Sequence, residues 1–141
     1  MPFQKTLSAD ELRVSDPVPP LAKTFTTVDL VAYGAATWDW HRLHYDLEYA
    51  RSVKLPNVII DGQAYGAVFA RAALDWLGPK AFICKLSLKY RSMAFAGDAL
   101  VTAGAVSAIR AEADHSLVTL ALAIRCGERL IAEATMDVRL P

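Results

Sequence analysis

The sequence predicts an α+β fold in which an antiparallel sheet of about five or six strands curves around one long helix. Its length of 141 residues, 54% of them hydrophobic and 21% charged, suits one folded domain with a large core. Residues 62–77 present a broad apolar face at helical spacing, and strand patterns then fill residues 85–140. Consecutive strands next to one long buried helix favour a sheet that wraps the helix, so we expect residues 1–141 to form a single domain.

The first half of the chain consists of short elements. Prolines in residues 17–20 keep the backbone extended into a lead-in strand at residues 21–25. A Thr-x-x-Asp start predicts a short helix over residues 28–33, and a loop is expected over residues 34–46. The aspartate that ends this loop can cap a second short helix at residues 47–52.

The long helix has clear ends. Asp61 is expected to be its N-cap, while Gly78 and Pro79 supply the usual stop chemistry. Apolar residues recur at i, i+1, i+4 and i+5, which predicts a deeply buried face. That face comprises Ala64, Tyr65, Val68, Phe69, Ala72, Ala73, Trp76 and Leu77.

Four strand patterns follow the helix. The first, over residues 85–91, alternates at period two, which predicts Leu86, Leu88 and Tyr90 inward and Lys85, Lys89 and Arg91 outward. The others cover residues 99–109, 115–125 and 128–140. Because short polar connectors separate them, we expect all four strands to form a meander.

Composition excludes several classes of partner. Fifteen Lys and Arg balance fifteen Asp and Glu, so no strong positive field exists for nucleic acid. No apolar run reaches membrane-spanning length, and residues 1–5 do not resemble a signal peptide, so we expect no membrane and a cytoplasmic location. Cys84 and Cys126 lie singly in apolar segments, which favours buried free thiols in a reducing compartment.

Residues 37–46 form the unusual segment, because they concentrate two His, two Asp and three aromatic residues in one loop. Asp39 and His44 are five residues apart, and a carboxylate and an imidazole in a loop can converge on one water as an acid–base pair. The alternative is that both are turn residues that hold the loop through side-chain to backbone hydrogen bonds.

A second candidate lies at the start of the long helix. The apolar run of residues 58–60 leads into Asp61 and Gly62. Free N–H groups and the positive end of the helix dipole can stabilise a developing oxyanion there, and glycine lets a substrate approach closely. The alternative is that Asp61 and Gly62 are a helix cap and a turn.

Together these motifs resemble the MaoC-like, (R)-specific enoyl-CoA hydratase family of hot dog folds, over residues 26–106. Residues 38–50 read W-D-W-H-R-L-H-Y-D-L-E-Y-A, similar to the family's G-D-x-N-P-[I/L]-H-x-D-x-x-[F/Y]-A. Residues 59–63 read I-I-D-G-Q, similar to I-[V/A]-H-G-M at the start of the central helix. Residues 90–98 read Y-R-S-M-A-F-A-G-D, similar to F/Y-R-x-P-x-x-x-G-D.

The resemblance implies reversible syn hydration of a 2-enoyl-CoA to a (R)-3-hydroxyacyl-CoA. Asp39 and His44 would then activate water, and the backbone N–H of Gly62 would bind the thioester oxygen. No cofactor other than the coenzyme A of the substrate is implied, and no metal is expected, since one short loop would have to supply every ligand. Expected substrate contacts are Trp38, Trp40, Tyr45, Asp61, Gln63 and Tyr65.

Three departures from the family pattern bear on function. His41 and Arg42 stand where the family has Asn-Pro, Trp38 replaces its Gly, and Asp61 replaces its His. A carboxylate at position 61 would repel an enolate unless it directs its charge into the helix N–H groups.

Two other functions stay open: a hot dog acyl-CoA thioesterase, and a subunit that is inactive until a second MaoC-like chain joins it. A lone hot dog leaves a sheet edge and one side of the site uncovered, so we expect a homodimer or a heteromer.

Overall fold

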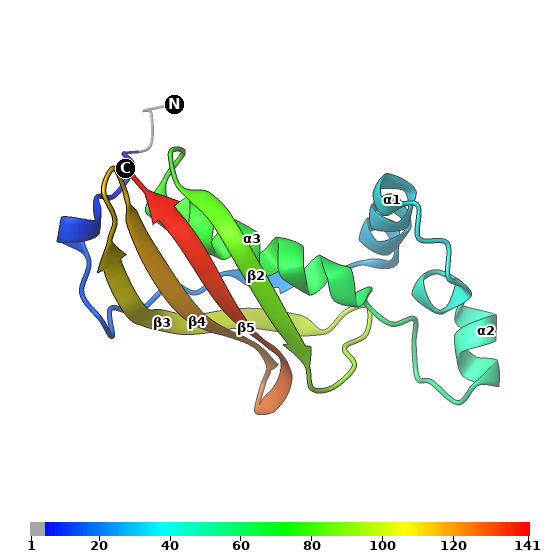
Figure 1. Ribbon diagram of the computed structural model, residues 1–141. Helices are drawn as coiled ribbons and strands as arrows, with labels where there is room; N and C mark the ends of the chain where they lie inside the picture. The colour runs from blue at the N-terminus through cyan, green and yellow to red at the C-terminus, as the bar shows by residue number, and fades with distance from the viewer. Residues whose placement is uncertain (1–4) are drawn as a thin grey trace.

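The computed structural model describes residues 5–141, so the expectation about the first residues lies mostly outside the described chain. One antiparallel sheet curves around a long helix, as the sequence predicts (Figure 1). The strands are β1 (Ala22–Thr24), β2 (Phe82–Tyr90), β3 (Ala99–Ala111), β4 (Ser116–Cys126) and β5 (Arg129–Leu140). The helices are α1 (Thr27–Thr37), α2 (Leu47–Ser52) and α3 (Gly62–Leu77), with 3-10 turns η1 (Ala9–Glu11) and η2 (Arg42–His44).

The sheet has the order β1-β3-β4-β5-β2, so the predicted four-strand meander is wrong for its first strand. Only β3, β4 and β5 are consecutive neighbours, while β2 pairs with β5 from Phe82↔Arg139 to Tyr90↔Ala132. The segment between β2 and β3 is not a tight turn: Phe95 within it bridges to Ile59, before α3. This detour carries the chain from one edge of the sheet to the other, where β1 pairs with β3.

Helix α3 lies in the trough of the sheet and forms the core with it. The predicted apolar face is buried except for Trp76, which is partly buried. Fully buried side chains of the sheet, such as Leu120, Ile124 and Met136, belong to the same cluster. Each large apolar side chain removed from water contributes roughly 1.5–3 kcal/mol, so this helix–sheet contact dominates the stability of the fold.

The prediction for the inward face of β2 is confirmed for two of its three residues. Leu86 and Leu88 pack against the core, and each lies close to the place that a Cβ on Gly66 of α3 would occupy. Tyr90 lies on that same face, above Gly62, but 58% of its surface is exposed instead of buried. The reason is that β2 is an edge strand and Tyr90 is its last residue, beyond the rest of the core.

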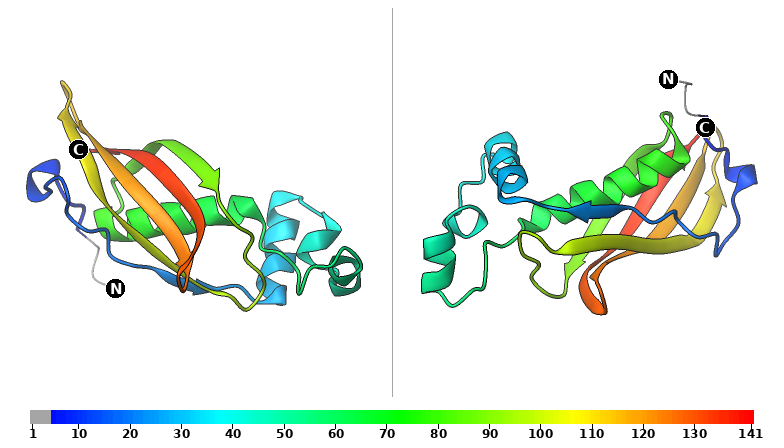
Figure 2. Two further views of the ribbon diagram at one scale, coloured as in Figure 1. Left: turned by 90° about the horizontal axis from the view of Figure 1, so that it is seen from below. Right: turned by 180° about the vertical axis from the view of Figure 1, so that it is seen from behind.

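Helix α1, η2 and α2 form a lobe beyond the N-terminal end of α3, outside the curve of the sheet (Figure 2). Helix α1 extends to Thr37, so the loop predicted from Gly34 is too long. Gly34 does not stop the helix. The carbonyl oxygen of Asp39 lies 2.8 Å from the place of a Cβ on residue 34, so glycine is needed there for close approach.

The two cysteines are unpaired, but the expectation that both are buried is wrong. Cys126 is partly buried, whereas Cys84 is exposed on β2. The register of β2 against β5 shifts between Ile83 and Lys85, so the ladder skips Cys84, and an edge strand has no neighbour to cover it. Among residues 5–141 no helix is long and apolar enough to cross a membrane.

Candidate active site

The lobe directs His44 towards the start of α3. The η2 turn places the imidazole next to Ile59, whose carbonyl oxygen lies 3.0 Å from Nδ1, and the Ile59 N–H donates to the Leu43 carbonyl at 2.9 Å. A carbonyl can only accept a hydrogen bond, so Nδ1 carries a hydrogen. In the neutral ring Nε2 is then left as an acceptor, and the side chain is only 14% exposed.

Asp39 faces this free nitrogen. Its Oδ2 lies 4.0 Å from His44 Nε2, while its Oδ1 accepts the backbone N–H of His41 at 3.1 Å. The Asp39 side chain is 32% exposed, so water reaches the gap between the two groups. The His41 ring lies edge to face with the His44 ring, with centroids 5.9 Å apart, and its Nδ1 accepts the Leu43 N–H at 3.3 Å. Asp39 and His44 therefore converge closely enough to share one water.

Asp61 joins them from outside the loop. It caps α3 as predicted, since its Oδ1 accepts the Gln63 N–H at 2.8 Å. Asp39, His44 and Asp61 each offer an atom within 4.8 Å of the others, and this set could hold a metal ion. Because Asp61 lies at the start of α3, the expectation that one short loop would have to supply every metal ligand is wrong.

The other oxygen of Asp61 is unusual. Only 6% of the residue is exposed, and its Oδ2 is buried without a hydrogen-bond partner in the described chain. A buried acceptor without a donor costs free energy of roughly 1–3 kcal/mol, and more when the group is charged. This oxygen therefore favours a donor that enters the site.

A cavity of about 390 Å³ opens at the start of α3, and His44, Gly62, Tyr65 and Tyr90 are among the residues that line it. The Tyr90 ring lies over Gly62: a Cβ on residue 62 would be 2.9 Å from Tyr90 Cε1. The remaining lining residues are Ile59, Ile60, Arg91, Ser92 and Met93. Tyr90 is a site residue that sequence reasoning assigned to the core, although it begins the third family-like motif.

Two further tyrosines surround the acidic cap. Tyr65 on α3 is buried, its hydroxyl accepts the Ala94 N–H at 3.3 Å, and burial raises its pKa to about 12. The pKa of Tyr33 on α1 is raised by burial first, then by the charge of Asp61 and by Tyr90. Both phenols therefore stay neutral around neutral pH, and the region near Asp61 gains no further negative charge.

Several predicted substrate contacts lie away from this cavity. Trp38 is 80% exposed, with a left-handed backbone at the end of α1. The Trp40 ring lies edge to face with those of Trp38 and Tyr45, with ring centroids 6.0 and 6.3 Å apart. None of these three lines the cavity, nor do Asp61 and the exposed Gln63, while Tyr65 and the neighbouring Gly62 do.

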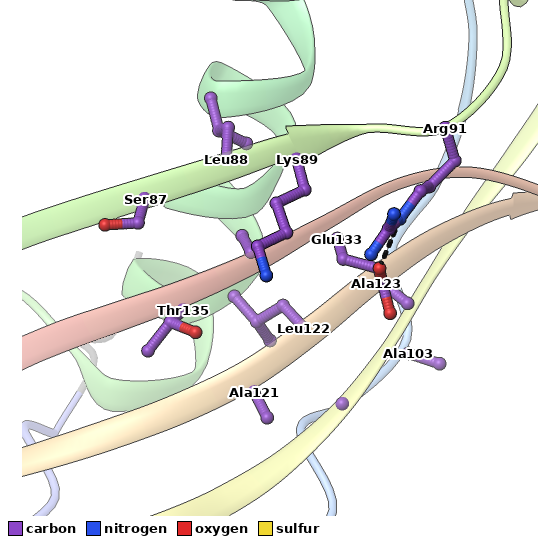
Figure 3. A pocket seen from close by; sticks show the side chains of 12 residues that line it. Ser87, Leu88, Lys89, Arg91, Ala103, Ala121, Leu122, Ala123, Glu133 and Thr135 are labelled. Atoms are coloured by element: carbon purple, nitrogen blue, oxygen red, sulfur yellow. Dashed lines mark hydrogen bonds and ion pairs between the residues drawn. The ribbon is translucent and has the colours of Figure 1, made fainter.

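A larger hollow of about 530 Å³ lies on the opposite side of the sheet (Figure 3). Small side chains such as Ala103, Ala121 and Ala123 form its floor, and Lys89 lies at its rim. Arg91 pairs there with Glu133 at 2.6 Å. None of Asp39, His44 and Asp61 lines this hollow, whereas His44 lines the smaller cavity at the start of α3.

Comparisons with known proteins agree with this picture. A family model described as MaoC like domain matches residues 13–126. The mitochondrial 3-hydroxyacyl-acyl-carrier-protein dehydratase of Arabidopsis thaliana is 32% identical over 107 residues, which cover 76% of this chain. The chain spans 62% of the length of that plant relative.

Solved structures show the same fold. The (R)-hydratase from A. caviae involved in PHA biosynthesis has a TM-score of 0.85 and 25% identity, over 94% of this chain and 100% of that one. A chain of the ChsH1-ChsH2 complex from Mycobacterium tuberculosis has a TM-score of 0.84 and 22% identity, over 92% of this chain and 98% of that one. The predicted hot dog fold is thereby confirmed.

Proposed function

The chain belongs to the MaoC-like domain family, and from that premise we propose that it catalyses the reversible syn hydration of a 2-enoyl-CoA to a (R)-3-hydroxyacyl-CoA. The observation that carries the proposal is the approach of Asp39 Oδ2 to within 4.0 Å of His44 Nε2, beside the cavity at the start of α3. Both groups accept hydrogen bonds, and a water between them would be held and activated.

In the proposed mechanism the thioester carbonyl binds at Gly62. The backbone N–H of Gly62 and the positive end of the α3 dipole would stabilise the enolate oxygen. Water held by Asp39 and His44 adds its oxygen to C3 and loses a proton to one of these two side chains, and one proton passes from the pair to C2, so that the elements of one water are added. The absence of a side chain on Gly62 matters because the Tyr90 ring already limits the space above it.

The thioester carrier is proposed to be coenzyme A. The A. caviae (R)-hydratase, which matches over its full length, supports a hydratase, whereas the plant relative is named for acyl-carrier protein. Parallel assays with crotonyl-CoA and crotonyl-acyl-carrier protein distinguish the two carriers. A much higher kcat/KM on the carrier-protein substrate would correct this part of the proposal.

We also propose that residues 1–141 act as a single domain and assemble through the sheet edge. Strand β2 is an edge strand, and Phe82 and Tyr90 on it are exposed apolar side chains. The likeness to a chain of the ChsH1-ChsH2 complex supports a heteromer as the alternative to a homodimer. The unpaired cysteines Cys84 and Cys126 agree with a reducing, cytoplasmic location, which stays a prediction.

The deciding experiment follows loss of the enoyl-thioester absorbance over a panel from crotonyl-CoA to bulky enoyl-CoAs. Asp39→Asn and His44→Ala should each lower kcat/KM by about a hundredfold or more, because each removes a general acid or base. Wild-type rates in both variants would refute the assignment of the site. Release of free CoA from saturated acyl-CoA would favour a thioesterase instead.

A further inference from the structure

We propose that Arg129, at the start of β5, is a positioning residue that holds one wall of the cavity at the start of α3 in the shape that binds substrate. The proposal rests on the hydratase function and deepens it, because it concerns how the same cavity holds an enoyl thioester. Arg129 lies beyond residues 13–126, which the family model matches, and it does not line the cavity itself. Its effect therefore passes through residues that do.

Three consecutive residues directly after β2 form part of the cavity wall. They are Arg91, Ser92 and Met93. The start of β5 lies beside them (Figure 1), and its backbone holds the first two. The Ile131 carbonyl accepts the N–H groups of both residues, at 2.9 and 3.2 Å, and the Leu130 carbonyl accepts the Ser92 hydroxyl at 2.6 Å. For Met93 the contact comes from a side chain instead.

Arg129 supplies that contact. Its Nη1 donates to the Met93 carbonyl, while its Nη2 donates to Asp98 Oδ2 at 2.8 Å. The same carboxylate oxygen accepts the Phe95 N–H at 2.9 Å. A guanidinium is planar and its N–H groups have fixed directions, so it holds two acceptors at a set separation. Arg129 thereby joins the two ends of the segment from Met93 to Asp98.

Met93 needs this contact more than its neighbours do. Within residues 5–141 the Met93 main chain has no hydrogen bond other than the one from Arg129. The next residue, Ala94, is held on both sides: its N–H donates to the Tyr65 hydroxyl at 3.3 Å, and its carbonyl accepts the Ile60 N–H at 2.9 Å. Met93 is also 52% exposed, so little packing restrains it. Loss of Arg129 should therefore displace Met93 first.

The ion pair fixes a position more than it stabilises the fold. The side chains of Arg129 and Asp98 are 40% and 24% exposed, so solvent screens their attraction. Displacing a cavity wall by about 1 Å nevertheless changes how substrate binds. Other contacts orient Asp39 and His44, so the reacting groups keep their places. Loss of Arg129 should therefore raise KM, with little change in kcat or in stability.

Methionine methyl NMR tests the positioning without substrate. The chain has three methionines, of which Met136 is fully buried in the core and reports the fold, while Met93 reports the wall. Arg129→Gln should shift or broaden the Met93 methyl signal and leave that of Met136 unchanged. Urea unfolding of the same variant should give nearly wild-type stability.

Kinetics with crotonyl-CoA supply the second arm. Arg129→Gln should raise KM about tenfold and change kcat less than about threefold. Arg129→Lys should recover part of the loss, because an ammonium restores the charge without the planar pair of donors. Asp98→Asn should raise KM similarly, and the double variant should add little, because the two side chains act as a pair. The matched control is Arg110→Gln, which removes an exposed arginine from its ion pair with Glu112 and should leave KM unchanged.

Wild-type KM in Arg129→Gln overturns the proposal, whether or not the Met93 signal moves. A lower kcat at unchanged KM, with a displaced Met136 signal, overturns it too, because the role is then in folding. If the wild type turns over no enoyl thioester while the Met93 signal moves in Arg129→Gln, the hydratase function fails and the positioning of the wall stands. If Arg129→Gln does not fold, Asp98→Asn removes the same pair from the other side and decides.

Discussion

Replacing Gly62 by Ala separates catalysis from stability. The new Cβ would lie 2.9 Å from Tyr90 Cε1 and 3.2 Å from its Cζ, so the ring must move by several tenths of an ångström. It can do so at little cost, because Tyr90 ends an edge strand and is 58% exposed. Gly62 is the first residue of α3, where Ala gains less than the roughly 1 kcal/mol that it has over Gly inside a helix, so we expect unchanged or slightly increased stability.

Hydratase activity should fall in Gly62→Ala, although stability does not. The methyl group and the displaced ring fill the approach to the first N–H groups of α3, where the thioester oxygen is proposed to bind. Loss of one oxyanion contact lowers kcat by about a hundredfold to a thousandfold, which corresponds to roughly 2.7–4 kcal/mol. We therefore expect a well-folded protein that has lost most of its hydratase activity.

Gly66→Ala is the matched control, since it is the same substitution one turn further along α3. Its Cβ would make ordinary contacts with Leu88 Cδ1 at 3.4 Å and Leu86 Cδ2 at 3.6 Å. Urea unfolding and enoyl-CoA turnover are measured for both variants. Wild-type turnover in Gly62→Ala, or an equal loss in Gly66→Ala, would refute the assignment of the oxyanion site to Gly62.

Three other predictions follow. Gly34→Ala should destabilise the fold by about 1–3 kcal/mol in urea unfolding and reduce turnover, because its Cβ would meet the Asp39 carbonyl at 2.8 Å; unchanged values contradict this. The folded pKa of Tyr65, about 12, exceeds the ordinary 10.0, so the folded state binds the phenolic proton more tightly. Its stabilising effect is complete below pH 10 and is lost between pH 10 and 12; Tyr65→Phe should flatten this slope, measured by chemical unfolding at several pH values. If assembly through β2 completes the site, dilution should lower specific activity as light scattering detects monomer, and constant activity in the monomer argues against it.

Much of the fold follows from local signals. The starts of α2 and α3 agree with the prediction because each helix has an Asp N-cap whose side chain accepts a backbone N–H of the first turn. The end of α1 was predicted too early because glycine often ends a helix. Gly34 instead allows the Asp39 carbonyl to approach the helix closely. Strand order was missed because pairing of β2 with β5 joins segments far apart in the sequence, which periodicity does not report.

In the site, too, the features set by local sequence were predicted and those set by the tertiary fold were not. The spacing of Asp39 and His44 sufficed to bring them together, since one loop contains both. The free oxygen of Asp61 was not predictable, because it depends on burial and on which of its oxygens the Gln63 N–H occupies. Tyr90 was assigned to the core from period-two alternation, and that pattern does not distinguish a central strand from the end of an edge strand.

The attachment of the lobe has a consequence for protein engineering. Asn57, Val58 and Ile60 are hydrogen-bonded to residues 94–96, and Ile59 holds Leu43 and His44, so both sides of the junction are fixed. Val53 and Lys54, which precede this junction, have exposed side chains, whereas Leu55 packs against the core, so side-chain substitutions that keep the orientation of the imidazole belong at those two positions. Directed evolution towards new acyl groups should therefore leave this junction unchanged and begin with libraries at a residue that lines the cavity away from it, such as Met93.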